Sequence, residues 1–266
     1  MTRATQDGLA EQYRDDRNLN ARLALHQRFS VNRYGWQPWL FDQLAFPSQA
    51  RILEVGCGPG DLWRRNASRI PAGWRLLLTD LSAGMAAAAR RNLAEQVGVM
   101  AVGVADAQDL PFCSASFDAV IANHMLYHVP DRSRALAELA RALRPGGCLV
   151  AATNGERNMA ELGTLVRGFD PTIRWEQYAA GFTLQNGAAQ LAPWFARVER
   201  LIYEDGLVIT EAEPLVAYVL SMQGNATQRL SGDQAAAFAD YVQRILARDG
   251  AIRIGKEAGM FRAWRS

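Results

Sequence analysis

The chain of 266 residues carries 29 Lys and Arg against 27 Asp and Glu, a net charge of +2, and 49% of its residues are hydrophobic. This composition is typical of a globular protein with a buried core, and it lacks the basic excess of nucleic-acid-binding proteins. The three cysteines form no Cys-X-X-Cys pair, which argues against a disulfide framework and against a thiolate zinc site. With no signal-peptide pattern and no apolar run of roughly 18 residues, we expect a cytoplasmic protein without membrane contact.

Helical patterns come first along the chain. The segments NLNARLALHQRF (18–29) and YGWQPWLFDQLAF (34–46) are predicted to be helices, the second rich in aromatic residues. We expect residues 1–46 to form a helical lid that packs over the mouth of the sheet predicted next.

Short apolar runs then alternate with helix-like segments, a pattern that predicts βαβ units and a parallel sheet. Ser82 is a plausible N-cap for a helix over 82–97, and Pro145 with the glycines after it is expected to stop a helix over 132–145. Several expected strands are too apolar to have one face in water, so helices should cover both faces. The expected strands are 51–56, 74–80, 99–106, 117–124 and 147–154.

The rest of the chain is predicted to hold amphipathic helices, interrupted by RVERLIYEDGLVIT (197–210). The stretch around GMFRAW near the C-terminus is strand-like and could form an antiparallel edge of the sheet with 197–204. No repeat or low-complexity linker separates the parts. We therefore expect a lid (1–46), a doubly wound core (47–154), and a helical insertion followed by the C-terminal strands (155–266).

The stretch ILEVGCGPG (52–60) places three glycines directly after the first expected strand. In a doubly wound sheet, ligands bind beyond the carboxyl ends of the strands, and glycines in the first turn let backbone amides approach them. A dinucleotide fingerprint would have its third glycine at position 61, where this chain has Asp61, which weakens a nicotinamide interpretation. Asp80 ends the second strand about 20 residues later, where a carboxylate can accept from both hydroxyls of a ribose.

Residues farther along the chain could hold an adenine ring. Asp106, after the third strand, can accept from the adenine amino group, and Ala107 can offer its N–H to a ring nitrogen. Leu81 and Met85 can supply the apolar faces between which the base lies.

With FDAVIANHMLYHVPD and LRPGG added, this order of motifs resembles the class I S-adenosylmethionine-dependent methyltransferases, in the branch similar to the ubiquinone and menaquinone biosynthesis enzymes. The resemblance covers about residues 50–154. It implies a Rossmann-like, mostly parallel sheet of seven strands, S-adenosylmethionine as cofactor with S-adenosylhomocysteine as product, and a small-molecule acceptor methylated at N, O or C. It also implies that Glu54 orients the glycine loop near the methionine amino group and that the carbonyl of Asn123 meets the ammonium. The loop residues that would wrap the methionine part are Gly56, Cys57, Gly58 and Gly60.

Methyl transfer from a sulfonium is an in-line displacement that depends mainly on holding the two reactants together, so neither a metal nor a triad is required. Where a general base helps, the candidates are His124 and His128, the second of which matches a histidine frequent in the family. The simpler interpretation of His128 is a structural histidine that caps a turn and shapes the pocket. Tyr13 matches an N-terminal tyrosine that many relatives place near the methyl donor.

The candidate acceptor-binding residues are polar or aromatic and lie in the lid, after the fourth strand and in the insertion. Aromatic rings can attract a sulfonium or an amine, although each of these side chains could instead serve only packing. The three histidines share no carboxylate-rich pattern, so no metal is expected. The candidates are His26, Tyr34, Trp36, Tyr127 and Trp175.

Three other functions remain as alternatives: a nicotinamide-dependent oxidoreductase, a nucleic-acid methyltransferase and a non-catalytic adenosyl-binding module. A nucleic-acid amine methyltransferase would carry an NPPY-like turn where this chain has Asn123 and His124, and a cytosine enzyme would need a Pro-Cys pair. Neither is present, so no nucleic-acid partner is expected. A monomer and a homodimer are both open.

Overall fold

The computed structural model describes residues 24–95, 99–173, 175, 181–221, 230 and 232–266. The chain forms two compact units, each described by itself. The sheet unit comprises Trp36–Glu156, Tyr178–Tyr203 and Ala258–Ser266, and the helical unit comprises Met1–Gly35, Arg157–Gln177 and Glu204–Glu257.

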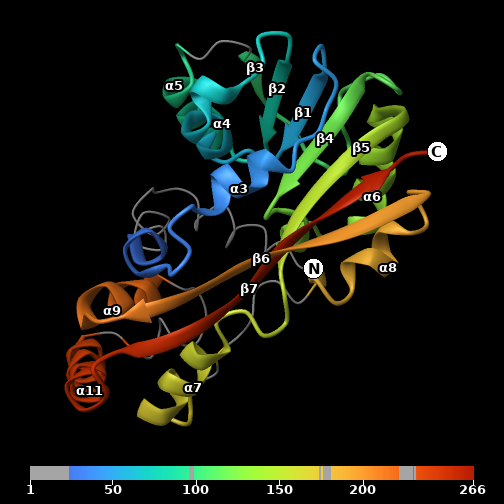
Figure 1. The fold of residues 1–266 in the computed structure, drawn as a ribbon. Helices are drawn as coiled ribbons and strands as arrows, with labels where there is room; N and C mark the ends of the chain where they lie inside the picture. Colours follow the sequence, from blue (N-terminus) through green and yellow to red (C-terminus); the bar gives the residue numbers. More distant parts are fainter. Residues whose placement is uncertain (1–23, 96–98, 174, 176–180, 222–229, 231) are drawn as a thin grey trace. The chain divides into compact units, whose positions relative to one another are not determined.

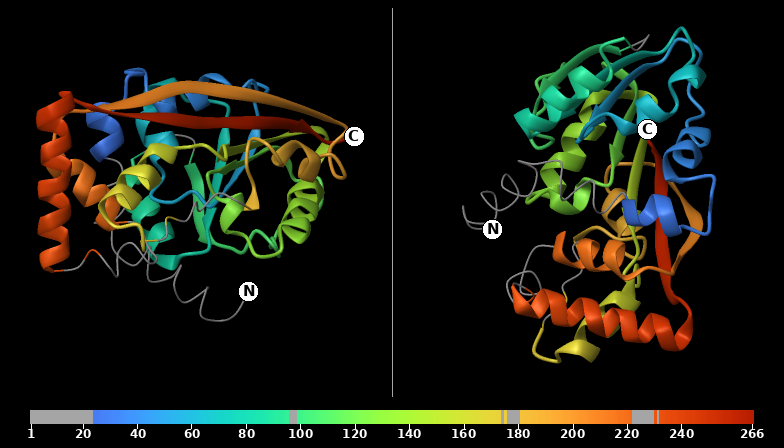
Figure 2. Two further views of the ribbon diagram at one scale, coloured as in Figure 1. Left: turned by 90° about the horizontal axis from the view of Figure 1, so that it is seen from below. Right: turned by 90° about the vertical axis from the view of Figure 1, so that its left-hand side faces the viewer.

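Seven strands form one sheet in the order β3-β2-β1-β4-β5-β7-β6 (Figure 1). The first five are parallel where they pair, and β7 runs antiparallel to β5, so the predicted doubly wound, mostly parallel sheet is confirmed. The last two strands lie side by side (Figure 2), as the strand-like patterns near residues 197 and 260 predicted. The strands are β1 (Arg51–Val55), β2 (Arg75–Asp80), β3 (Val99–Val104), β4 (Phe117–Asn123), β5 (Leu143–Asn154), β6 (Arg197–Ile209) and β7 (Ile252–Trp264).

The central strands are apolar throughout because helices cover both faces of the sheet. On one face, Leu53, Val120 and Leu149 pack with α6 and the segment that contains α8, and on the other, Ile52 and Ile121 pack with α3, α4 and α5. These helices are α3 (Trp36–Asp42), α4 (Asp61–Arg65), α5 (Ala83–Asn92), α6 (Arg132–Ala142) and α8 (Gly187–Leu191).

The predicted cap at Ser82 is present, and Asp131 caps α6 in the same way. The Ser82 hydroxyl accepts from the backbone N–H of Met85 at 3.3 Å and caps α5, and the Asp131 carboxylate accepts from the Arg134 N–H at 3.0 Å and caps α6. Side-chain oxygens thereby satisfy N–H groups that the first helical turn leaves without a partner.

The end of α6 differs from the prediction. The helix stops at Ala142 rather than near Pro145, and β5 already begins at Leu143. Arg265 at the end of the chain donates to the carbonyls of Arg141 and Leu143, and its backbone pairs with Gly146 and Gly147. These contacts across more than a hundred residues fix an extended chain where the local sequence still favours helix.

The helical unit has its own apolar core, built around Leu25, Leu162, Leu215 and Phe238. Residues 24–29 are helical, and the other helices are α7 (Ala160–Phe169), α9 (Ala212–Ser221) and α11 (Asp233–Asp249). No helix in the described part of the chain has both the length and the apolar character that crossing a bilayer requires. The division into a lid, a core and an insertion stays a prediction.

Candidate functional site

The sheet order reverses between β1 and β4, because β2 and β3 continue to one side of β1 and β5 continues beyond β4. In doubly wound sheets, ligands bind at this switch point, outside the carboxyl ends of the strands. The structure brings four of the predicted cofactor segments to that edge: the glycine loop after β1, Asp80 at the end of β2, the Asp106 loop after β3 and Asn123 at the end of β4.

Glycine is required in the loop after β1 for two different reasons. Gly56, Gly58 and Gly60 all have positive φ, at 64°, 54° and 81°. A Cβ on Gly56 would lie 2.7 Å from the Met125 Cβ, and one on Gly60 would lie 2.6 Å from the Leu93 Cδ1, so both sites are closely packed. A Cβ on Gly58 would meet nothing within 4 Å, so the backbone there borders open space that a ligand can fill.

Asp80 joins the glycine loop to the turn after β2. Its Oδ2 accepts from the Gly58 N–H at 2.9 Å, and its Oδ1 accepts from the Ser82 N–H at 2.8 Å. Burial raises the pKa of this carboxyl, and the two N–H groups partly oppose the shift. Each oxygen keeps a further lone pair that can accept from a ribose hydroxyl.

Glu54 is a buried carboxyl at 1% exposure, and its Oε2 accepts from the Trp63 Nε1–H at 2.6 Å. Burial raises its pKa to about 8; the Trp63 hydrogen bond opposes this rise, and the nearby Asp80 carboxylate adds to it. Burial also raises the pKa of the Cys57 thiol, with added contributions from Glu54 and Asp80. Among the described residues, no lysine or arginine contributes to these shifts. With their pKa values raised, the Glu54 carboxyl and the Cys57 thiol keep their protons at neutral pH, and we call Glu54, Cys57 and Asp80 together the acidic cluster.

Two apolar side chains are unusually exposed at the same edge. Leu81 is 64% exposed and Val104 is 53% exposed, and Val104 pairs with Asp80 across β2 and β3. Met85, in contrast, is 4% exposed. Sequence reasoning selected Leu81 and missed Val104, whose signal is its place at the end of the third strand. It also missed Trp63, because nothing local pairs that indole with Glu54.

Asp106 is held within its own loop. One oxygen accepts from the Gln108 backbone N–H at 2.8 Å, and the Gln108 Nε2 donates to both carboxylate oxygens at 3.0 Å. Ala107 is 6% exposed. The carboxylate therefore already binds an amide N–H group, the same kind of donor as an adenine amino group.

An aromatic cluster lies beyond the end of β4 in the sheet unit. The Trp36 ring is 4.7 Å from His124 and 5.4 Å from Tyr203, and the Trp36 Nε1 donates to the Asn123 Oδ1 at 3.2 Å. His124 has a φ of 56°, which is rare for a residue with a side chain and is often found at functional sites. The cluster consists of Trp36, Trp39, His124, Tyr127, His128 and Tyr203.

The other predicted acceptor-binding residues that the structure describes belong to the helical unit. The His26 ring lies 5.8 Å from Tyr218, Tyr34 is 53% exposed, and Trp175 packs beside α7. Tyr13 lies outside the described residues. No group of three or more His, Cys, Asp or Glu side chains in the described ranges could hold a metal ion.

Residues 53–151 match the family model described as a methyltransferase domain. The chain therefore contains a methyltransferase domain similar to those of the class I S-adenosylmethionine-dependent methyltransferases. It transfers a methyl group from S-adenosylmethionine to a small-molecule acceptor, and the comparisons give no support to the oxidoreductase, nucleic-acid or non-catalytic alternatives.

This methyltransferase is similar in sequence to two curated relatives. It is 28% identical over 223 residues to the demethylmenaquinone methyltransferase of Symbiobacterium thermophilum, covering 77% of this chain and 88% of the relative. It is 34% identical over 150 residues to the malonyl-acyl-carrier-protein O-methyltransferase of Enterobacter lignolyticus, covering 55% of this chain and 56% of that relative. The chain thus spans about half the length of the second relative.

A solved structure supports the fold. Phosphoethanolamine N-methyltransferase 2 of Haemonchus contortus, in complex with phosphomonomethylethanolamine and S-adenosylhomocysteine, aligns with a TM-score of 0.60 at 17% identity. The alignment covers 98% of this chain and 60% of that chain, and at this identity it shows the fold alone.

Proposed function

We propose that the sheet unit of this methyltransferase binds the methionine part of S-adenosylmethionine against the acidic cluster of Glu54, Cys57 and Asp80. The observation that carries the proposal is geometric: the Gly58 N–H donates to Asp80 at 2.9 Å, a Cβ on Gly58 would meet nothing within 4 Å, and the buried Glu54 lies at the end of β1 just before this loop. The sulfonium and ammonium groups of the cofactor would bring positive charge to this edge of the sheet.

The remaining cofactor contacts follow from the same edge of the sheet. Gly56, Cys57, Gly58 and Gly60 wrap the methionine part, and the open space beside Gly58 supports this assignment. Asp80 accepts from the ribose hydroxyls, and the Asn123 carbonyl faces the ammonium. Adenine lies against exposed Leu81 and Val104, with its amino group on Asp106 and a ring nitrogen on Ala107, while Met85 packs beneath.

We infer that the acceptor is a planar small molecule with an aromatic ring. The aromatic cluster supports this class, because rings at 4.7 to 5.4 Å from one another can extend their offset or edge-to-face contacts to a planar ligand. Trp36 and Tyr127 would contact it directly. The name of the Symbiobacterium relative, a demethylmenaquinone methyltransferase, points to the same chemistry.

Of the two candidate bases, His124 suits the reaction better. Its ring lies between Trp36 at 4.7 Å and Tyr127 at 6.4 Å, within the aromatic cluster. His128 belongs to the same cluster, with its ring 4.5 Å from Tyr127, but it ends a regular 3₁₀ helix over Leu126–His128 and lacks the positive φ of His124. The contributions of Tyr13, His26, Tyr34 and Trp175 stay predictions.

A cytoplasmic location is part of this proposal. All three cysteines are free thiols, and Cys57 and Cys148 are buried, as expected of a protein in a reducing compartment. A monomer or a homodimer would each be compatible with a site built within one sheet unit.

The acceptor proposal is tested by incubating the enzyme with methyl-labelled S-adenosylmethionine and a panel of hydroxylated naphthalenes, phenols and aliphatic amines. We expect label in the aromatic acceptors, and a rise in their KM of about three- to tenfold in Trp36→Leu, because one ring contact is lost. Trp264→Leu, a partly buried tryptophan outside the cluster, is the matched control. Label in the amines alone would contradict the proposal.

A further inference from the structure

We propose that one stripe of α6 is a positioning device for the adenine-recognition loop, residues 106–112, and sets the enzyme's selectivity for the adenine base. The inference rests on the role proposed above for Asp106. The stripe comprises Asp131, Arg134, Glu138 and Arg141, whose spacing of three, four and three residues puts them on one side of the helix.

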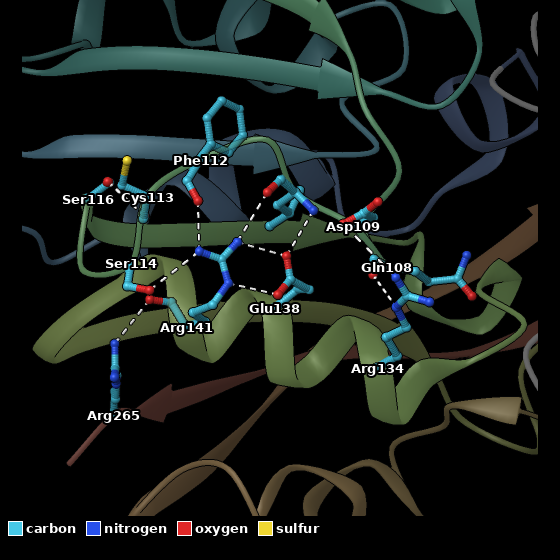
Figure 3. Close-up of polar contacts among 11 residues, drawn as sticks. Gln108, Asp109, Phe112, Cys113, Ser114, Ser116, Arg134, Glu138, Arg141 and Arg265 are labelled. Carbon is cyan, nitrogen blue, oxygen red and sulfur yellow. Dashed lines mark hydrogen bonds and ion pairs between the residues drawn. The ribbon is translucent and has the colours of Figure 1, made fainter.

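The stripe binds the loop at every second residue. Arg134 Nε donates to the Gln108 carbonyl at 2.7 Å, and the Leu110 N–H donates to Glu138 Oε2 at 2.9 Å. Arg141 donates to the Leu110 carbonyl at 3.1 Å and to the Phe112 carbonyl at 2.7 Å (Figure 3). The backbone of the loop is thus fixed by side chains of a single helix.

Arg141 can bind two carbonyls because Glu138 holds its guanidinium. Arg141 Nε and Nη2 donate to the two Glu138 oxygens at 2.7 and 2.8 Å, in the bidentate geometry that only arginine provides (Figure 3). The hydrogen bond from Arg141 keeps the pKa of Glu138 below its usual value, so the pair is charged at neutral pH. Its contacts are charge-assisted hydrogen bonds, which are stronger than neutral ones.

Gln108 connects the stripe to Asp106. Its Nε2 donates to both Asp106 oxygens at 3.0 Å, while its Oε1 accepts from the Asp131 N–H at 3.0 Å, at the start of α6. The direction of the Asp106 carboxylate therefore depends on the position of α6.

This arrangement separates selectivity for the base from binding of the ribose. Asp80 is held by Gly58 and Ser82, and among the described residues its carboxylate makes no hydrogen bond to the α6 stripe. A shift of the loop would therefore weaken recognition of the adenine amino group and leave the contacts of Asp80 in place.

The test compares binding of S-adenosylhomocysteine and S-inosylhomocysteine, which differ at the exocyclic position that Asp106 would contact. We expect the wild-type enzyme to prefer the adenosyl compound by roughly tenfold or more, the scale of one unpaired hydrogen bond. In Arg141→Lys and Glu138→Gln, we expect this preference to fall severalfold. Arg248→Gln, which removes an exposed ion pair on α11, should keep the wild-type preference.

Two further variants separate the possible failures. Asp106→Asn replaces one acceptor with a donor, and an unchanged preference there would refute the proposed adenine role itself. Should Asp106→Asn lose the preference while Arg141→Lys and Glu138→Gln keep it, the positioning inference is wrong. Gln108→Leu removes the side-chain contacts that join Asp106 to the start of α6 and leaves α6 itself unchanged. A retained preference in Gln108→Leu would therefore also refute the positioning inference, even where a helix variant does not fold.

Discussion

Gly58 and Gly146 both adopt a left-handed backbone conformation, but they lie in different surroundings. Both have positive φ, at 54° and 73°, and a Cβ on either would meet nothing within 4 Å. Alanine should therefore cost each site about 1 kcal/mol of stability from the left-handed backbone alone. Only Gly58 borders the proposed cofactor space.

We predict that Gly58→Ala weakens S-adenosylmethionine binding at least about tenfold, because its methyl group occupies space that the ligand needs. Gly146→Ala should lose similar stability and bind normally. Thermal unfolding and calorimetric titration of both variants check this pair, and equal binding by both would remove Gly58 from the site.

Glu54 links pH to stability. Its pKa of about 8 lies above the ordinary glutamate value of 4.5, so between these values the folded chain keeps a proton that the unfolded chain releases. The free energy of unfolding should therefore fall as pH rises from 4.5 to 8 and level off above 8. At about 1.4 kcal/mol per pKa unit, this loss is on the order of 5 kcal/mol.

Glu54→Gln keeps an oxygen acceptor for Trp63 and removes this titration. We expect the variant to lose much less stability than the wild type between pH 5 and pH 8 in urea unfolding. Parallel pH dependence in the two proteins would show that Glu54 ionises normally. The same pKa implies that a bound cation displaces the proton, so binding at pH 7 should release protons in the wild type only.

Among helix starts, the cap of α5 adjoins the proposed ribose site. Ser82→Ala removes the hydroxyl that accepts from Met85 and keeps the backbone N–H that holds Asp80. We expect a loss of about 1 kcal/mol in stability with unchanged cofactor affinity. Ser116→Ala, at an exposed turn, is the control for a serine outside a helix cap. A large loss of affinity in Ser82→Ala would mean that the hydroxyl itself binds the ligand.

The strands were predictable from sequence where the signal is local. β1, β2 and β4 begin and end within two residues of their predicted bounds, because each is an apolar run between turn residues. The boundary between α6 and β5 was not predictable, since Arg265 sets it from more than a hundred residues away. Within the site, the glycine loop and Asp80 follow from motif spacing, whereas the Trp63 contact with Glu54 and the α6 stripe depend on tertiary pairing.

At the scale of the whole molecule, the net charge of +2 conceals a local acidic cluster in the sheet unit. The helical unit has its own core, built from segments that are far apart in the sequence. The strands β6 and β7 each contribute residues to both units.

The most direct test of the proposed site is calorimetric titration of the wild-type enzyme and Asp80→Asn with S-adenosylmethionine, S-adenosylhomocysteine and NADH. We predict that the wild type binds both sulfur nucleosides and not NADH, and that Asp80→Asn loses most of this affinity while staying folded. Binding of NADH, or full affinity for S-adenosylmethionine in Asp80→Asn, would contradict the assignment of the carboxyl ends of β1 and β2 as the cofactor site.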